Sequence, residues 1–231
     1  MRRILLACIL ALPFFATAAE AAQFIVVEAR GINMKVGALI DPTKPLVLTQ
    51  GQHLTLISDS GKTIKLDGPY QKAPVAEQGI QLAAAFSGLA TEKNARLGEI
   101  GTTRGAAPTV HPPNAWLLDA THSGTVCLQE GHDPILWRPT TSGALPVVIQ
   151  PADRSWKIET KWADGSDRLS VRSDLGMHGD ASYFVSINGV ENAIAIDSVP
   201  AALSSDSMRA AWMIEKGCAP QAQALMQTAA K

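Results

Sequence analysis

Histidine and aspartate side chains gather in one part of the chain, and together they could bind a metal ion. The segment 111–133 holds His111, Asp119, His122, His132 and Asp133. Imidazole nitrogens and carboxylate oxygens are ligands of zinc, and a zinc site needs three or four of them to converge. A metal-dependent hydrolase that uses these residues is therefore one hypothesis for the protein.

The spacing of these residues does not favour a preformed metal site. No H-E-x-x-H motif places two histidines on one face of a helix. His111 stands in a proline-rich stretch, and His122 and His132 stand in turn contexts. Surface histidines beside strands are the simpler interpretation. The sequence predicts no metal site and no cofactor, and the five residues stay as the candidates for the alternative.

No motif for nucleophilic catalysis occurs in the chain. The G-x-S-x-G pattern, which places a serine on a strained turn between a strand and a helix, is not found. No pair of acidic residues is singled out by its spacing as the acid and base of a glycosidase. We predict no catalytic residues, and the protein is expected not to be an enzyme.

The first residues are typical of a secretory signal peptide. Arg2 and Arg3 precede an apolar run from Ile4 to Phe15, and small residues with an A-x-A pattern follow. The run is too short for a transmembrane helix, which needs roughly 20 apolar residues. The sequence predicts a signal peptide over 1–22, export to the periplasm, and no integral membrane segment after cleavage.

Cleavage of that peptide would leave two cysteines, Cys127 and Cys218. Because the periplasm is oxidising, one intramolecular disulfide is favoured over two free thiols. Such a bridge would close a loop of about 90 residues and stabilise the fold by at most about 4–5 kcal/mol in the chain-entropy model.

Bulk composition indicates an ordinary globular protein with a nearly neutral surface. The 231 residues are 46% hydrophobic, and the formal net charge is −1. Such a chain can bury a core. It has no basic run of the kind that binds nucleic acid, so we predict no nucleic-acid partner.

Turn signals and changes in composition divide the rest of the chain into four segments. Residues 23–70 predict a small N-terminal β module, and residues 71–115 an Ala-rich helix followed by a Gly/Pro-rich linker. Residues 116–203 predict an antiparallel β-sandwich-like domain, since several short alternating strands are separated by turns. Residues 204–231 predict a helical tail. The expected fold is mainly β.

Local patterns predict details of the two β units. Leu54 and Leu56 alternate with polar residues, so one face of that strand is expected to be buried and the other solvated. The turn "SDSG" predicts a hairpin in which Gly61 has a positive φ. In the second unit, "TVCLQ" and "ILWRP" are expected to form a hairpin, "ADGSD" to turn the chain into "RLSVR", and Asn188-Gly189 to form a tight turn.

The tail is predicted to contain two short helices. Ser205 or Asp206 can cap the first, Gly217 ends it, and Pro220 suits the first turn of the second. Short helices are marginal alone, so a disulfide at Cys218 is expected to hold the tail on the sandwich.

Tryptophan side chains offer a further hypothesis, an envelope-glycan-binding module. Sugars stack on exposed aromatic rings, but rings at alternating or helical spacing beside apolar residues favour a place in the core. The five tryptophans are Trp116, Trp137, Trp156, Trp162 and Trp212.

The stretch "LVLTQGQHLTLISDSGKTIKLDGP", residues 46–69, resembles the small β module of FecR-type periplasmic signalling proteins. Other stretches, among them "SYFVSING" and "AAWMIEKGCAPQAQAL", resemble exported proteins of α-proteobacteria. The FecR-like resemblance implies a role in envelope signalling, although FecR-type proteins also carry a membrane helix that we do not expect here. We therefore predict a non-enzymatic periplasmic protein that binds an envelope or membrane protein partner, as an accessory to a membrane-bound sensor.

Overall fold

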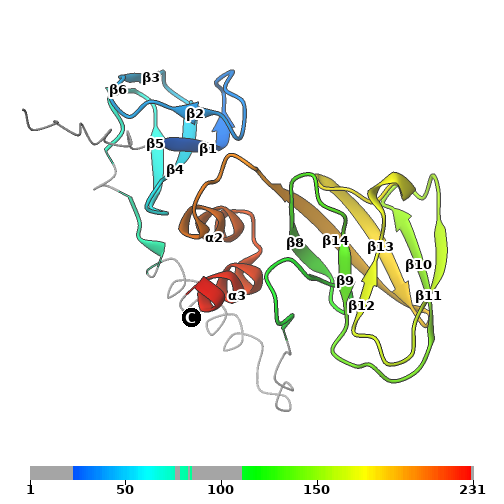
Figure 1. Cartoon of the computed structure of the whole chain (residues 1–231). Coiled ribbons are helices and arrows are strands. Elements are labelled where there is room, and N and C mark those ends of the chain that lie inside the picture. Colours follow the sequence, from blue (N-terminus) through cyan, green and yellow to red (C-terminus); the bar gives the residue numbers. More distant parts are fainter. Residues whose placement is uncertain (1–22, 76–78, 83, 85–110, 230–231) are drawn as a thin grey trace, which may run out of the picture.

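The computed structural model describes residues 23–75, 79–82, 84 and 111–229. The predicted signal peptide and most of the predicted linker lie outside the described residues. Within them the fold is mainly β, with several antiparallel sheets and two C-terminal helices (Figure 1). No described helix combines the length and the apolar character needed to cross a membrane.

The N-terminal module contains a four-stranded antiparallel sheet and a two-stranded one. Their strands are β1 (Phe24–Arg30), β2 (Leu39–Ile40), β3 (Leu46–Leu48), β4 (His53–Ser58), β5 (Thr63–Asp67) and β6 (Tyr70–Lys72). The first sheet has the order β2-β1-β4-β5, and β3 pairs with β6. The β4–β5 hairpin is confirmed, and Gly61 in its turn has a φ of +77°.

The prediction that β4 has one solvated face is wrong. Leu54 and Leu56 pack into the core of the module, but Thr55 and Ile57 on the opposite face are buried as well. Ile57 belongs to a second core that contains the C-terminal helices. The alternation of residue types indicated which residues face the module's own core, and it contained no sign that helices distant in sequence cover the other face.

The second β unit is a sandwich of a five-stranded and a three-stranded sheet. Its elements are β7 (Leu118–Asp119), β8 (Gly124–Gln129), β9 (Ile135–Trp137), β10 (Leu145–Pro151), β11 (Ile158–Trp162), β12 (Arg168–Ser170), the 3-10 turn η2 (Ser173–Leu175), β13 (Ala181–Ile187) and β14 (Val190–Val199). The sheets have the orders β11-β10-β13-β14-β8 and β12-β9-β7. The two-residue Asn188-Gly189 turn between β13 and β14 is confirmed, with both residues at positive φ.

Two of the predicted strand pairings are wrong. β8 and β9 form no hairpin, because β8 pairs in parallel with β14 and β9 pairs with β12 and β7. β11 and β12 also lie in different sheets, since β11 pairs with β10. In both cases the intervening turn carries the chain from one sheet to the other. An alternating strand shows which of its faces is buried but not which neighbour it pairs with.

The tail forms two helices, α2 (Asp206–Glu215) and α3 (Ala219–Ala229). Ser205 is the N-cap of α2, and its Oγ accepts a hydrogen bond from the backbone N–H of Met208. Gly217, with a φ of +86°, follows the end of α2. The predicted disulfide between Cys127 in β8 and Cys218 between the helices is present.

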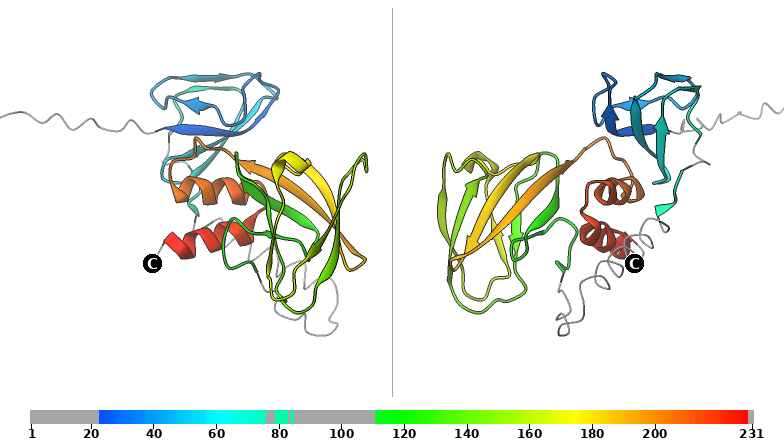
Figure 2. Two further views of the ribbon diagram at one scale, coloured as in Figure 1. Left: turned by 45° about the vertical axis from the view of Figure 1, so that its right-hand side comes forward. Right: turned by 180° about the vertical axis from the view of Figure 1, so that it is seen from behind.

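The helices lie between the two β units, not on the sandwich alone (Figure 2). One continuous core joins all three parts. It contains Ile25 and Ile57 of the N-terminal module, Trp212 of α2, and Cys127 and Val199 of the sandwich. The tail therefore connects the two β units through buried apolar contacts, which corrects the expectation that it packs on the sandwich only.

Only a short part of the predicted Ala-rich helix is described. There, Ile80 forms a β-bridge with Thr63 of β5 through two backbone hydrogen bonds of 2.8 and 3.1 Å. Leu82 packs against the core that contains the helices. The segment thus continues the N-terminal sheet before it reaches the helical tail.

Candidate functional site

The five candidate metal ligands do not come together as one group. His122 and Asp119 are paired, with 2.9 Å between Nδ1 and Oδ2, and His111 lines the same cavity of about 220 Å³. His132 and Asp133 lie in the turn that follows β8. Within the described ranges, no group of three or more His, Cys, Asp or Glu side chains is placed to hold a metal ion.

Asp119 has a local structural role. Its Oδ1 accepts hydrogen bonds from the backbone N–H and the hydroxyl of Thr121, at 2.8 and 2.6 Å. An aspartate that bonds the backbone two residues ahead stabilises a turn. The same carboxylate orients the exposed ring of His122.

All five tryptophans lie in the described part of the chain, and none of them is exposed. Trp137, Trp162 and Trp212 are buried in the cores. Trp116 and Trp156 are partly buried and pack against core clusters. The interpretation of these rings as core residues agrees with their burial, and they form no exposed stacking platform.

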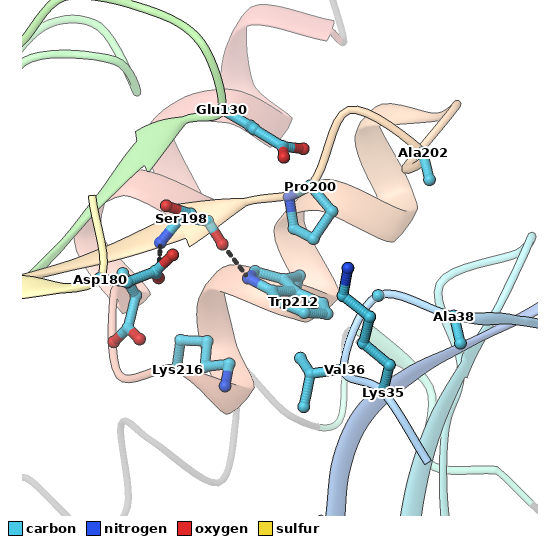
Figure 3. A pocket seen from close by; sticks show the side chains of 12 residues that line it. Lys35, Val36, Ala38, Glu130, Asp180, Ser198, Pro200, Ala202, Trp212 and Lys216 are labelled. Atoms are coloured by element: carbon cyan, nitrogen blue, oxygen red, sulfur yellow. Dashed lines mark hydrogen bonds between the residues drawn. The ribbon is translucent and has the colours of Figure 1, made fainter. Parts of the chain in front are cut away.

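A larger groove of about 490 Å³ opens where the N-terminal module, α2 and the sandwich meet (Figure 3). Its lining residues come from all three parts of the molecule and from the segment that joins β14 to α2. They are Lys35, Val36, Gly37, Ala38, Glu130, Asp180, Asp197, Ser198, Pro200, Ala202, Trp212 and Lys216.

The loop between β1 and β2 forms the wall of the groove on the side of the N-terminal module. Gly37 has a φ of +85°, and its N–H donates to the carbonyl of Val26 at 2.8 Å. A Cβ atom at Gly37 would lie 3.8 Å from Cγ of Pro200, so this loop approaches the segment between β14 and α2. The turn thereby presents Lys35 and Val36 to the groove.

Trp212 and Ser198 fix the position of α2 against β14. The indole Nε1–H of Trp212 donates to the carbonyl of Ser198 at 3.1 Å. The ammonium of Lys216 lies 5.2 Å from the centre of the Trp212 ring, within the range of a cation–π contact. Figure 3 shows Trp212 and Pro200 at the centre of the site, with Lys35 on one side and Asp180 and Lys216 on the other.

Three carboxylates line the groove, and they differ in their partners. Asp180 accepts a hydrogen bond from the N–H of Ser198, and Glu130 accepts one from the N–H of Ala201, both at 2.9 Å. The side chain of Asp197 forms no hydrogen bond or ion pair with any residue in the described part of the chain, although the charge of Lys216 acts on it. Its carboxylate is therefore partly buried without a donor.

The environment of Asp197 disfavours its charged form. Burial raises the pKa of this carboxyl above its ordinary value, and the like charge of Asp180 adds to the rise, while Lys216 opposes both effects. Among titratable groups, such a raised pKa in a concave site is typical of functional residues.

The backbone beside this carboxylate pair is unusual. Asp180 has a φ of +58°, a left-handed conformation that aspartate tolerates better than most residues. At the preceding Gly179, a Cβ atom would lie 2.1 Å from Oγ of Ser198. A side chain there would displace the Ser198 hydroxyl, so glycine is favoured, and this close approach brings Asp180 up to the end of β14.

Sequence reasoning did not find this groove. Asp180 directly precedes β13 and Asp197 lies near the end of β14, so the hairpin separates them in the chain although its pairing brings them together, and Lys35 is far away in the chain. One local signal was present, because Asp197 interrupts the apolar run "AIAI" near the end of a strand. A carboxylate at such a position suggests either an exposed strand end or a functional site.

The chain was compared with models of known protein families, with curated proteins and with solved structures, and none of the three comparisons found a match.

Proposed function

We propose that the protein is an exported, non-enzymatic binding protein of the cell envelope. In this proposal it acts in the periplasm, where it binds an envelope or membrane protein as an accessory to a membrane-bound sensor. The groove at the junction of the two β units and α2 is the proposed binding site. The observation that carries the proposal is the carboxylate of Asp197, which is partly buried in this groove and receives no hydrogen bond from any described residue.

The charged form of this carboxylate destabilises the folded state, because its burial outweighs the opposing effect of Lys216. Burying a charged or polar group without a partner is unfavourable unless something supplies the missing interactions. Binding and catalytic sites contain such groups because a ligand, not the fold, provides the partner. The volume of the groove lies in the range of roughly 300–1,000 Å³ that is usual for ligand pockets.

Two further observations support the proposed periplasmic location of the protein and the proposed kind of partner. Cys127 and Cys218 are fully buried and bonded to each other, and structural disulfides persist in oxidising compartments such as the periplasm. The resemblance of residues 46–69 to a FecR-type module favours an envelope signalling system as the source of the partner.

Site-specific photo-crosslinking in the native bacterium tests the proposal. A photoreactive amino acid at Val36, an exposed residue that lines the groove, should form an adduct with one envelope protein. The matched control is Val190, which is also exposed but stands at the start of β14, at the opposite end of that strand from the groove.

An adduct at position 36 and none at position 190 would support the proposal. If neither position forms an adduct in periplasmic fractions, or both form the same one equally, the groove is not the partner site and the proposed function fails.

A further inference from the structure

We infer that the occupant of the groove is an extended peptide segment of a partner protein that places a positively charged side chain between Asp180 and Asp197. This inference rests on the proposed function, because it names the chemistry of what the proposed site binds. Four features of the groove carry it: the acceptors of Asp180 and Asp197 that no described residue uses, the apolar surface beside them, the exposed ammonium of Lys35 at the opposite end, and the overall balance of charge.

The two aspartates present acceptors that the protein does not use. Asp180 offers Oδ1 to the N–H of Ser198, and no hydrogen bond to its Oδ2 is found in the described residues. Asp197 has no donor in the same part of the chain. A guanidinium or ammonium between the two carboxylates would supply charge-assisted hydrogen bonds and offset their mutual repulsion.

Apolar surface lies directly beside these carboxylates. Pro200 and Trp212 line the middle of the groove, and the Trp212 ring is held in place by its hydrogen bond to Ser198. Arginine and lysine carry a long aliphatic stem below their charged group, and that stem packs well on apolar side chains. The partly exposed Pro200 offers this apolar contact, while the buried Trp212 ring, 2% exposed, supports the floor of the groove. A carboxylate pair beside this proline therefore fits such a side chain better than it fits a small inorganic cation.

The end of the groove opposite Asp180 carries an exposed ammonium group. Lys35 is exposed there and takes part in no ion pair between described residues. Figure 3 shows its side chain on the far side of Trp212 from Asp180. A peptide chain that continues past the buried cationic side chain can offer a carbonyl or carboxylate oxygen to this ammonium, whereas a lone amine cannot.

The charges of the lining residues agree with an occupant of this kind. Three carboxylates and two ammonium groups line the groove, so its formal charge is slightly negative, and at the end with Asp180 and Asp197 the single ammonium of Lys216 balances only one of the two carboxylates. Charge complementarity favours a segment with a net positive charge near Asp197 and an acceptor near Lys35.

Binding of two synthetic peptides tests the inference. One is the acetylated and amidated sequence Gly-Ala-Arg-Ala-Asp-Gly, and the other carries citrulline, a neutral analogue of nearly the same shape, in place of arginine. The readout is the NMR signal of the Trp212 indole N–H, which lies in the groove. We expect the arginine peptide to bind at least about tenfold more tightly, as charge-assisted hydrogen bonds predict.

The variant Asp197→Asn should lose this preference, and Asp67→Asn, which changes an exposed carboxylate on the N-terminal module, should keep it. Equal affinity for the two peptides would overturn the cationic recognition, even if crosslinks at Val36 support the proposed partner site. Binding of arginine amide as tight as that of the peptide would overturn the assignment of an extended segment. Crosslinks that fail at Val36 would instead reject the proposed function itself, so the two failures are distinguishable.

Discussion

The side-chain amide of Gln221 pairs with both backbone groups of Cys127. The N–H of Cys127 donates to Oε1 of Gln221 at 2.6 Å, and Nε2 of Gln221 donates to the carbonyl of Cys127 at 2.8 Å. Because Cys127 lies in β8 at the edge of the five-stranded sheet, the amide takes the place of a peptide group on a neighbouring strand. Gln221 thereby covers a sheet edge that would otherwise be open, close in the chain to the disulfide partner Cys218.

Replacement of Gln221 by leucine should destabilise the protein. The substitution removes an amide that accepts a hydrogen bond from the N–H of Cys127 and donates to the carbonyls of Cys127 and Ala115. These three buried backbone groups would lose their partner. Each buried group left unsatisfied costs about 1–3 kcal/mol, so for the three groups together we expect a loss of at least about 3 kcal/mol in the free energy of unfolding, measured with urea. The control is Gln223→Leu on the exposed face of the same helix, which should change it by less than about 0.5 kcal/mol. Equal effects of the two substitutions would contradict the structural role of the amide pair.

Removal of the disulfide should loosen α3 before the rest of the protein. The double variant Cys127→Ala, Cys218→Ala avoids leaving a single buried thiol, and its free energy of unfolding should fall by at most about 4–5 kcal/mol. Without the bridge, α3 depends on Gln221, Ala222 and Leu225 for its buried contacts. Limited proteolysis should therefore cut first within α3.

Mass spectrometry of unreduced peptides first checks that the disulfide is formed. A peptide pair that contains Cys127 and Cys218 should be recovered from protein taken from the periplasm, where we propose that the protein acts. Full alkylation of both thiols without reductant would show that the bridge is not formed there.

The features that the sequence predicted correctly depend on neighbours in the chain or on a choice with few options. The Asn188-Gly189 turn and the Ser205 cap are local, and the two cysteines outside the predicted signal peptide leave one pairing. The features that it missed depend on distant contacts. Ile57 is buried by helices that begin about 150 positions later in the chain. The alternation of residue types in its strand does not indicate that helices cover the second face of that strand. The groove likewise exists only because three distant segments meet.

Gly61 should be intolerant of substitution because of its contact with α2. It has a φ of +77°, and a Cβ atom there would lie 2.7 Å from the backbone oxygen of Ser207. Gly61→Ala should thus destabilise the protein through both backbone strain and displacement of the hairpin from α2. Gly165→Ala is a matched control, since Gly165 has the same φ of +77° and nothing lies within 4 Å of its Cβ position.

The difference in melting temperature between these two variants isolates the contact with α2. We expect the Gly61 variant to melt at a clearly lower temperature than the Gly165 variant. Equal melting temperatures would mean that the hairpin does not press against α2 in solution.

Asp197→Asn should make the protein more stable at neutral pH while it weakens binding in the groove. Burial raises the pKa of Asp197 above its ordinary value of 3.8, so the folded protein holds this proton more tightly than the unfolded chain does. The free energy of unfolding therefore falls as pH rises from 3.8 through the raised pKa, and the full destabilisation is present at neutral pH. Asparagine removes that charge, so urea unfolding should show a higher free energy of unfolding than that of the native protein at pH 7, and this difference should disappear below pH 3.8.

Asp41→Asn should behave in the opposite way, because the side-chain and backbone hydrogen bonds from Thr43 lower the pKa of Asp41 and its charged form stabilises the fold. A loss of stability at pH 7 in Asp197→Asn would show that the carboxylate serves the fold, and the groove would then lack the unmet acceptor on which its assignment as a binding site depends.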